Sequence, residues 1–258
     1  MHKTARQKLL MELLLKDGQV GISQLVEQLQ VSADTVRRDL AYLEKKGLAQ
    51  KNHGGAVALD LSAMNRQQRS VLIPAVKASL GSYVADKIPA GSTLFLDAGS
   101  TMLAVASMLK GPATVITPSL DIAFHLSDKP DIELIVLGGQ WDKQQRLFSG
   151  SATLKLLEQY RADIAILGAC ALHAEFGLSA SQEADAEVKR AMLAASSEHW
   201  VVADHMKPKR CEPDPVAQLT ETQQPFLNSP WTAFEASGST QLSLPNNQRY
   251  GEHHHADN

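Results

Sequence analysis

Apolar residues near the start of the chain recur with the period of helices that bury one face. The first predicted helix carries a run of leucines from Leu9 to Leu14 and ends at Asp17-Gly18. Ser23 and Ser32 have side chains that cap helices, so we expect a second, short helix after Ser23 and a third after Ser32. The third helix should end at Gly47.

Two short segments with strand character follow the third helix. Residues 48–52 and 56–59 flank His53-Gly54-Gly55, and this arrangement predicts a β-hairpin, or wing. Three helices and a wing are typical of a winged helix-turn-helix domain, which we place in residues 1–58. Residues 59–75 are polar and lead to Pro74, so we interpret them as a linker.

From Val76 onward, short apolar segments alternate with amphipathic ones. The predicted strands are 93–96, 114–116, 133–137, 164–167 and 200–203, and the predicted helices are 76–87, 101–109, 119–127, 151–160 and 183–197. Such alternation predicts an α/β fold with a doubly wound, mostly parallel sheet, over residues 76–210. Residues 211–258 contain five prolines and no sustained period, so we expect an irregular C-terminal tail.

Composition and charge fit a globular protein with a polyanionic partner. The chain has 258 residues, of which 44% are hydrophobic and 21% charged. Its net charge of −3 is uneven: residues 1–58 carry +3 and the remainder carries −6, which favours nucleic acid as the partner of the first domain. Two cysteines and the lack of a long apolar run or signal peptide predict a cytoplasmic protein that does not enter membranes.

The third predicted helix supplies candidate DNA contacts. The candidates, on this helix and on the wing, are Ser32, Thr35, Arg37, Arg38, Lys51 and His53. Arginine can bridge guanine edges or clamp phosphates, and a Gly-Gly wing tip can approach the DNA backbone closely. The alternative interpretation is an ordinary amphipathic helix with a solvated charged face.

A second candidate site follows the strand at 93–96, where Asp97-Ala98-Gly99-Ser100-Thr101 leads directly into a helix. Free backbone amides and two hydroxyls at such a turn can bind an anion at the carboxyl edge of the sheet. The same spacing also fits a plain helix cap with a turn glycine, and spacing alone does not decide between the two.

Several motifs resemble one known family. Thr35 to Leu40, then Leu43-Glu44 and His53-Gly54-Gly55-Ala56, are similar to the signature of the DeoR/GlpR family of sugar-metabolism repressors. The resemblance extends over residues 4–207. It implies a sensor domain related in fold to ribose-5-phosphate isomerase that binds phosphorylated sugars.

The resemblance also implies which residues bind the effector. They are Asp97, Gly99, Ser100, Thr101, Ser119, Gly139, Lys189 and Lys207. By analogy, Ser100 and Thr101 would hold the phosphate, Asp97 would accept from sugar hydroxyls, and Lys189 and Lys207 would face the anion.

The chain departs from the family pattern at three places. Pro118 stands where the family usually has asparagine, and His205-Met206 replace two serines before Lys207. Residues beyond 210 do not resemble the family's closing strand, loop and helix, so an edge of the sheet would be left uncovered.

These observations predict a transcriptional repressor of a carbohydrate operon, a dimer or tetramer on operator DNA, released by a phosphorylated sugar. We expect no catalytic residues, cofactor or metal; His253-His254-His255 are interpreted as solvated tail and Cys170 as core. One alternative is a sugar-phosphate isomerase using Asp97, Glu183 and Lys207 for acid–base chemistry. Another is a regulator whose divergent tail has disabled its sensor.

Overall fold

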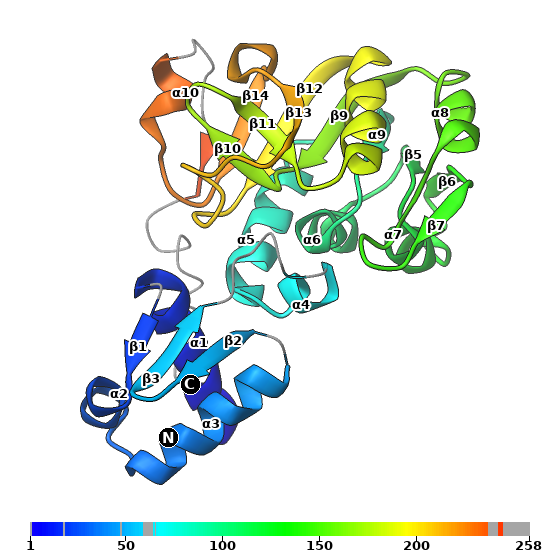
Figure 1. Cartoon of the computed structure of the whole chain (residues 1–258). Helices are drawn as coiled ribbons and strands as arrows, with labels where there is room; N and C mark the ends of the chain where they lie inside the picture. The colour runs from blue at the N-terminus through cyan, green and yellow to red at the C-terminus, as the bar shows by residue number, and fades with distance from the viewer. Residues whose placement is uncertain are drawn as a thin grey trace. The chain divides into compact units, whose positions relative to one another are not determined.

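The chain forms two compact units, residues 1–73 and 74–258. A computed structural model describes residues 2–17, 19–46, 48–58, 64, 66–236 and 242–244 (Figure 1). Gly18 and Gly47, which we expected to end two helices, lie outside the described residues, as does the histidine tail.

The first unit contains three main helices and a small antiparallel sheet in the order β1-β3-β2. Its elements are α1 (Lys3–Asp17), β1 (Gln19–Gly21), α2 (Ile22–Leu29), α3 (Ala33–Lys45), β2 (Ala49–Asn52), β3 (Gly55–Ala58) and α4 (Arg66–Ser70). The predicted winged helix-turn-helix is therefore confirmed.

Two details of this unit differ from the prediction. Helix α2 begins after Gly21, not after Ser23, and its N-cap makes no side-chain hydrogen bond. Strand β1 was not predicted, because a three-residue strand carries too little pattern to recognise; it is held by pairing with β3, from Gln19 opposite Val57 to Gly21 opposite Gly55.

The expected linker at 59–75 is wrong for the part that is described. Residues 66–70 form α4, and the side chains of Arg66 and Leu72 are 6% and 1% exposed. Described residues up to 73 belong to the first unit, while residues 59–63 and 65 lie outside the described residues.

The second unit is built on a parallel sheet of seven strands. Its helices are α5 (Pro74–Ala85), α6 (Ser100–Met108), α7 (Leu120–Leu126), α8 (Ser151–Leu157), α9 (Glu183–Ala194), η1 (Leu219–Glu221) and α10 (Thr232–Ala236). Its strands are β4 (Thr93–Leu96), β5 (Ala113–Thr117), β6 (Ile132–Val136), β7 (Gln140–Asp142), β8 (Leu147–Ser149), β9 (Ala162–Gly168), β10 (Ala171–His173), β11 (Gly177–Ala180), β12 (Ser196–Ala203), β13 (Asp214–Ala217), β14 (Gln224–Leu227) and β15 (Leu242–Ser243).

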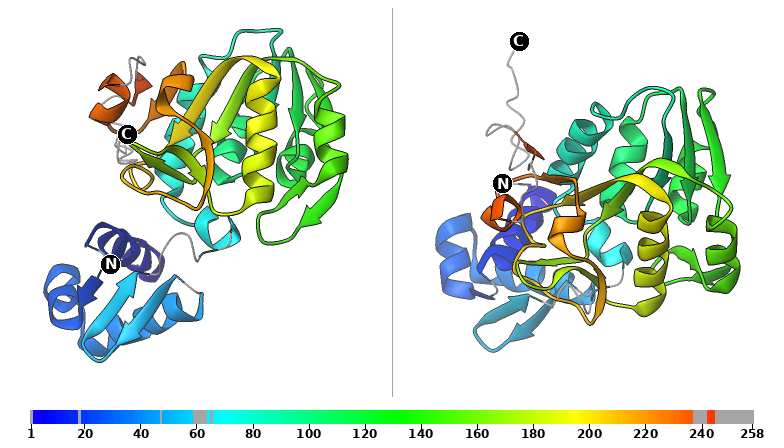
Figure 2. Two further views of the ribbon diagram at one scale, coloured as in Figure 1. Left: turned by 45° about the horizontal axis from the view of Figure 1, so that its top comes forward. Right: turned by 90° about the horizontal axis from the view of Figure 1, so that it is seen from above.

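Helices cover both faces of this sheet, as the alternating pattern predicted. The strand order is β15-β14-β12-β9-β4-β5-β6, and every pair is parallel. Helices α5, α6 and α7 lie on one face, and α8 and α9 lie on the other (Figure 2). Phe95, Ala165 and Val201, from three neighbouring strands, are buried in the core. The doubly wound α/β fold is confirmed.

The order of the strands reverses between β4 and β9. From β4 the chain proceeds to β5 and β6 on one side, and then returns to β9 and β12 on the other. Loops at the carboxyl ends of strands diverge at such a switch point and leave a crevice where open α/β sheets bind ligands. The loop from Asp97 to Ser100 begins at this point.

The predicted irregular tail is wrong for residues 214–236. Strand β13 joins β10 and β11 in a small antiparallel sheet, and β14 extends the main sheet beyond β12. Phe226 and Phe234 are fully buried, so the segment supplies the closing strand whose absence we expected. Pro225 disguised β14, because proline is a loop signal in sequence.

Candidate functional site

Helix α3 presents the residues expected to contact DNA. Ser32 caps the helix: its hydroxyl accepts from the amide of Thr35 at 3.3 Å. The side chains of Arg37 and Arg38 are exposed, while Val36 and Leu40 are fully buried. The helix is thereby fixed by its apolar face, and its cationic face is open to solvent.

The two arginines are held near the start of α3 by Asp34. The Arg37 guanidinium donates to the Asp34 carboxylate at 2.9 Å, and Arg38 Nε donates to the Asp34 carbonyl at 3.3 Å. These contacts are exposed, so each is weak and can be exchanged for a phosphate or base at little cost.

Sequence reasoning did not find a role for Asp39, the next residue of the motif. Its carboxylate is 3% exposed and accepts from Arg6 Nε at 2.5 Å and from Gln7 Nε2 at 2.9 Å. Asp39 therefore connects α3 to α1. The sequence contained one sign of this role, because Asp39 is an acidic residue on a helix that we interpreted as cationic.

The wing carries the other two DNA candidates. Lys51 lies on β2 and His53 in the turn before β3, and both are exposed. The turn is held by Asn52, whose side chain accepts from the amide of Gly54 at 3.1 Å. A Cβ at Gly55 would lie 1.8 Å from the carbonyl oxygen of Val20, so glycine is required where β3 meets β1.

The loop after β4 starts α6 without a side-chain cap. Gly99 is the N-cap residue, with φ 144° and ψ 163°, a conformation available essentially to glycine alone. The amides and hydroxyls of Ser100 and Thr101 have no hydrogen-bond partner among the described residues, and both side chains are partly exposed. These groups, with the positive end of the helix dipole, are suited to an anion.

Asp97 and Lys189, two expected effector contacts, bind each other in the structure. Both are buried, and the Lys189 ammonium forms an ion pair with Asp97 Oδ2 and lies 3.5 Å from Asp185 Oδ1. Asp97 Oδ2 also accepts from the amide of Gly168 at 3.0 Å, across the switch point. The other oxygen, Asp97 Oδ1, is buried with no partner in the described part of the chain.

A second carboxylate lies at the end of β12. Asp204 is 1% exposed; its Oδ1 accepts from the amide of Met206 at 2.9 Å, and its Oδ2 is buried without a partner in the described ranges. Lys207, three residues on, is half-buried, and no described residue binds its ammonium. Neither Gly168 nor Asp185 was among the sequence candidates, because their contacts join distant segments.

Ser119 and Gly139, two further expected effector contacts, have structural roles at the carboxyl edge of the sheet. The hydroxyl of Ser119, which is 1% exposed, caps α7 by accepting from the amide of Ile122 at 3.4 Å. Gly139 has φ 149°, and a Cβ there would lie 2.0 Å from Thr153 Oγ1. Both residues therefore shape the carboxyl edge of the sheet through packing.

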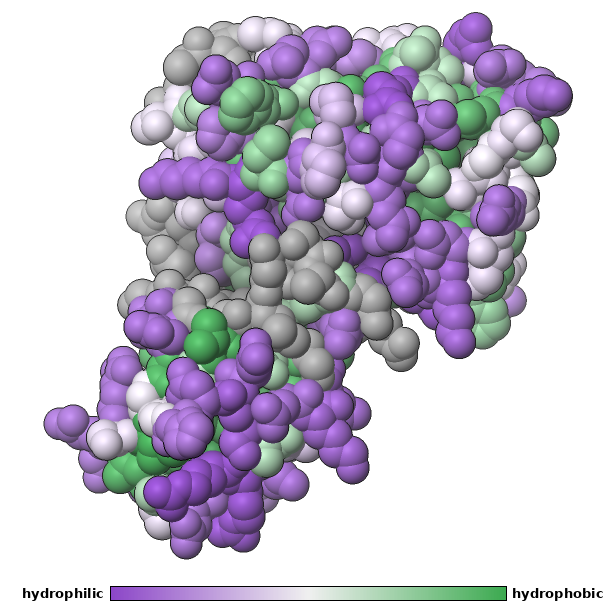
Figure 3. All heavy atoms as spheres, in the orientation of Figure 1, coloured by the Kyte–Doolittle hydropathy of each residue, from purple (hydrophilic) through white to green (hydrophobic). Residues whose placement is uncertain are grey.

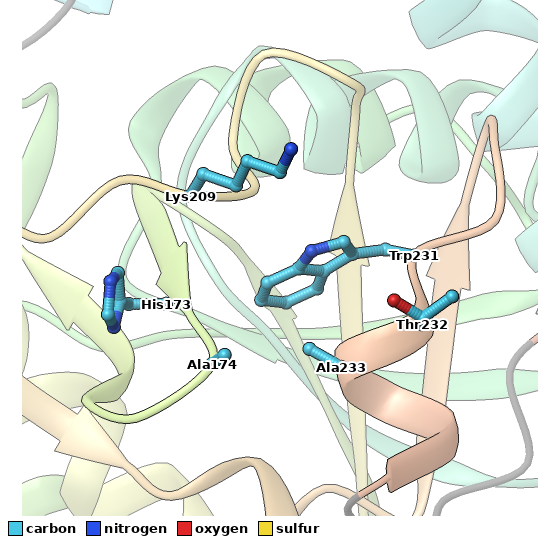
Figure 4. Close-up of a pocket in the computed structure, with 6 residues that line it drawn as sticks. All are labelled: His173, Ala174, Lys209, Trp231, Thr232 and Ala233. Carbon is cyan, nitrogen blue, oxygen red and sulfur yellow. The ribbon is translucent and has the colours of Figure 1, made fainter.

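A hollow of about 390 Å³, whose lining includes no residue of the switch-point loop, lies between the tip of β10 and the start of α10 (Figure 4). It is lined by His173, Ala174, Lys209, Trp231, Thr232 and Ala233. No local pattern signals this hollow, because its walls come from three distant segments and one of them belongs to the tail that we expected to be irregular.

The described residues contain neither a cluster of metal-ligating side chains nor a membrane-spanning helix. No group of three or more histidine, cysteine, aspartate or glutamate side chains there could hold a metal ion. No helix there is both long and apolar enough to cross a membrane.

Comparison with known proteins places both units in one group. Residues 6–61 match a family model described as a DeoR-like helix-turn-helix domain, and residues 74–225 match one described as the DeoR C-terminal sensor domain.

Curated relatives match across both units. The glycerol-3-phosphate regulon repressor of Escherichia coli is 35% identical over 211 residues, which is 80% of this chain and 83% of the relative. The transcriptional repressor AccR of Agrobacterium fabrum is 36% identical over 207 residues, 78% of this chain and 80% of the relative. The repressor GlcR of Bacillus subtilis is 32% identical over 210 residues, 80% of this chain and 81% of the relative.

Solved structures give a weaker likeness. Ribose 5-phosphate isomerase A from Neisseria gonorrhoeae has a TM-score of 0.38 and 17% identity, covering 52% of each chain.

Proposed function

The chain belongs to the DeoR family of transcriptional regulators, and we propose that it is a DNA-binding repressor of a carbohydrate-utilisation operon that a phosphorylated sugar releases from its operator. The observation that carries the proposal is the pairing, in one chain, of an exposed cationic recognition helix with an uncapped, hydroxyl-bearing helix start at a sheet switch point. Its relatives named as repressors support the first half, and the sensor-domain match supports the second.

The DNA contacts come from α3 and the wing. Helix α3 enters the major groove, Arg37 and Arg38 contact guanine edges or phosphates, and the hydroxyls of Ser32 and Thr35 contact phosphates. Lys51 and His53 on the wing contact the DNA backbone. One such helix reads too few base pairs for specificity, so the protein acts as a dimer or tetramer on paired half-sites.

The effector binds at the loop after β4. Its phosphate accepts hydrogen bonds from the amides and hydroxyls of Ser100 and Thr101, with Gly99 allowing close approach. A sugar hydroxyl donates to Asp97 Oδ1, the buried oxygen with no described partner, and Lys207 supplies a cation at the rim.

Release requires that the sugar phosphate binds one conformation of the sensor more tightly than another. The buried network provides a route, because Asp97 begins the loop while Lys189 and Asp185 belong to α9. A hydroxyl that binds Asp97 changes the hydrogen bonds available to Lys189, and so biases the position of α9 against the sheet.

This function makes the protein a cytoplasmic regulator and not an enzyme. Of the groups considered for isomerase chemistry, the Asp97 carboxylate is occupied by Lys189, and Glu183 accepts from Arg190 at the surface. A base that is already paired with a buried cation is poorly placed to take a proton.

A thermal-shift screen of the full chain against sugar phosphates and the matching free sugars tests the sensor. A ligand that binds only the folded state raises the melting temperature, so one sugar phosphate should do so and its unphosphorylated sugar should not. If no sugar phosphate shifts the melting temperature, the sensor assignment fails; turnover of the ligand would instead support an enzyme.

A further inference from the structure

Strand β6 ends the main sheet and has an open edge. Among the described strands it pairs only with β5. Natural proteins guard such edges with charges, prolines or bulges, but β6 reads Ile132-Glu133-Leu134-Ile135-Val136. Its single charged side chain is directed toward β5, where the Glu133 carboxylate accepts from the Thr114 hydroxyl at 3.1 Å.

The hydrogen bonds that flank β6 show which backbone groups face outward. The Asp131 carbonyl accepts from the amide of Ala113 at 3.2 Å, and the amide of Leu137 donates to the Thr117 carbonyl at 2.9 Å. Odd-numbered residues therefore direct their backbone groups toward β5. Because direction alternates along a strand, Leu134, like the other even-numbered residues, presents its amide and carbonyl to the open side.

Apolar side chains lie beside this edge. Phe124 and Leu120, one turn apart on α7, are 82% and 46% exposed, whereas Ile122 and Leu126 of the same helix are buried against the domain. Val136 on β6 is 39% exposed. Green and pale residues interrupt the hydrophilic surface along this side of the sensor unit (Figure 3). Large exposed apolar side chains on neighbouring elements favour an interaction surface.

We propose that β6 and α7 form a two-fold interface with a second copy of the chain, in which the two β6 strands pair antiparallel about Leu134. In this register Leu134 exchanges both backbone hydrogen bonds with Leu134 of the second copy. Val136 lies opposite Ile132 of the second copy, and the Val136 amide donates to the Ile132 carbonyl. The Ile132 amide takes no part, because it already donates to the Lys129 carbonyl of its own chain at 3.3 Å. Phe124 and Leu120 then pack against α7 of the second copy.

A second copy fits this edge better than another partner because the surface is complementary to itself. A two-fold axis brings identical patches together, and the register places Glu133 opposite Ile135, so like charges do not meet. The register also directs Asp131, which directly precedes β6, toward the β7–β8 hairpin of the other copy. Lys143 is exposed on that hairpin. Charge and apolar surface are thus both matched.

The interface deepens the proposed function, because binding to paired half-sites requires two recognition helices. It rests on the proposed function in that respect alone. Its test uses the full chain without DNA or effector. Sedimentation of the wild type should give an even-numbered oligomer, and Phe124→Asp should weaken the association at least tenfold. The control Phe176→Asp changes another exposed phenylalanine, 52% exposed on the β10–β11 turn, and should leave association unchanged.

Cross-linking tests the register itself, in a background in which the exposed Cys211 is replaced by serine. Directly opposite, hydrogen-bonded residues have Cα atoms about 5.5 Å apart, within disulfide range, so Leu134→Cys should form a covalent dimer on oxidation. Val136→Cys should not, because the two copies of position 136 are displaced by about 14 Å along the strands.

A monomeric wild type, or a mass that Phe124→Asp leaves unchanged together with no cross-link at position 134, would overturn the interface. Neither result depends on operator or ligand. A chain that forms this dimer but fails to bind DNA would contradict the proposed function and leave the interface standing.

Discussion

Asp97 and Lys189, 92 residues apart in the chain, form an ion pair in which each side chain is 1% exposed. Two charges removed from water are stable only when each has its counter-charge and hydrogen bonds. Asp185 and the amide of Gly168 complete the arrangement. The pair fixes the start of the switch-point loop to α9.

Replacing Lys189 with methionine should destabilise the sensor unit by about 3–5 kcal/mol, because Asp97 would stay buried without its counter-charge. All three tryptophans, Trp141, Trp200 and Trp231, lie in this unit. Tryptophan fluorescence during urea denaturation therefore reports its unfolding alone.

Lys110→Met is the matched control for that experiment. Lys110 pairs with Asp86 at 3.1 Å, but the two side chains are 84% and 57% exposed, and exposed pairs contribute little. The urea midpoint should hardly move for this variant. Equal urea midpoints for the two variants would show that the buried ion pair contributes no more to stability than the exposed one.

Arg37→Ala and Arg38→Ala should each weaken operator binding by about 1–3 kcal/mol, because each removes a contact to a base edge or phosphate. Fluorescence anisotropy with labelled operator DNA measures the change. Arg161→Ala is the control, since Arg161 is an exposed arginine of the sensor unit that donates to its own backbone neighbours. Unchanged affinity in both α3 variants would remove α3 from the DNA contacts.

Asp39→Ala should destabilise the first unit by about 3 kcal/mol, because Arg6 would lose its buried partner and α1 its tie to α3. Circular dichroism should show an earlier loss of helix on heating. The tryptophan transition should stay in place, since no tryptophan lies in this unit. A shift of that transition as large as the shift in circular dichroism would contradict a local role for Asp39.

Thr101→Val should reduce the affinity for the sugar phosphate about tenfold to a hundredfold, since a hydrogen bond to a charged group contributes roughly 1.5–3 kcal/mol. Isothermal titration calorimetry with the sugar phosphate found in the thermal-shift screen measures this change, and operator affinity without ligand should be unaltered. Thr220→Val serves as the control, because Thr220 is exposed on η1. Wild-type affinity in Thr101→Val would mean that the phosphate binds elsewhere.

The strong elements of the fold could be predicted because their signals are local. Strand β4 was predicted at its observed bounds, and Ser32 as the cap of α3, because an apolar run and a capping hydroxyl act on their own neighbourhood. The short strands β7, β8, β10 and β11 were missed, since each is held by pairing with another segment.

The site could be predicted less completely, for a related reason. From the sequence, we assigned Asp97 and Lys189 separately to contacts with the effector, because no local pattern shows that residues so far apart are neighbours. The same holds for Asp39, whose partners lie on α1. The helix start at Ser100 was accessible to prediction, because a glycine and two hydroxyl residues are adjacent in sequence there.

Release of labelled operator DNA by sugar phosphates, followed by anisotropy with the full chain, tests the central claim most directly. A phosphorylated sugar should lower the operator affinity at least tenfold, the same sugar without phosphate should not, and Thr101→Val should stay bound at ligand concentrations that release the wild type. Release by the free sugar to the same extent, or no release by any sugar phosphate, would contradict the account.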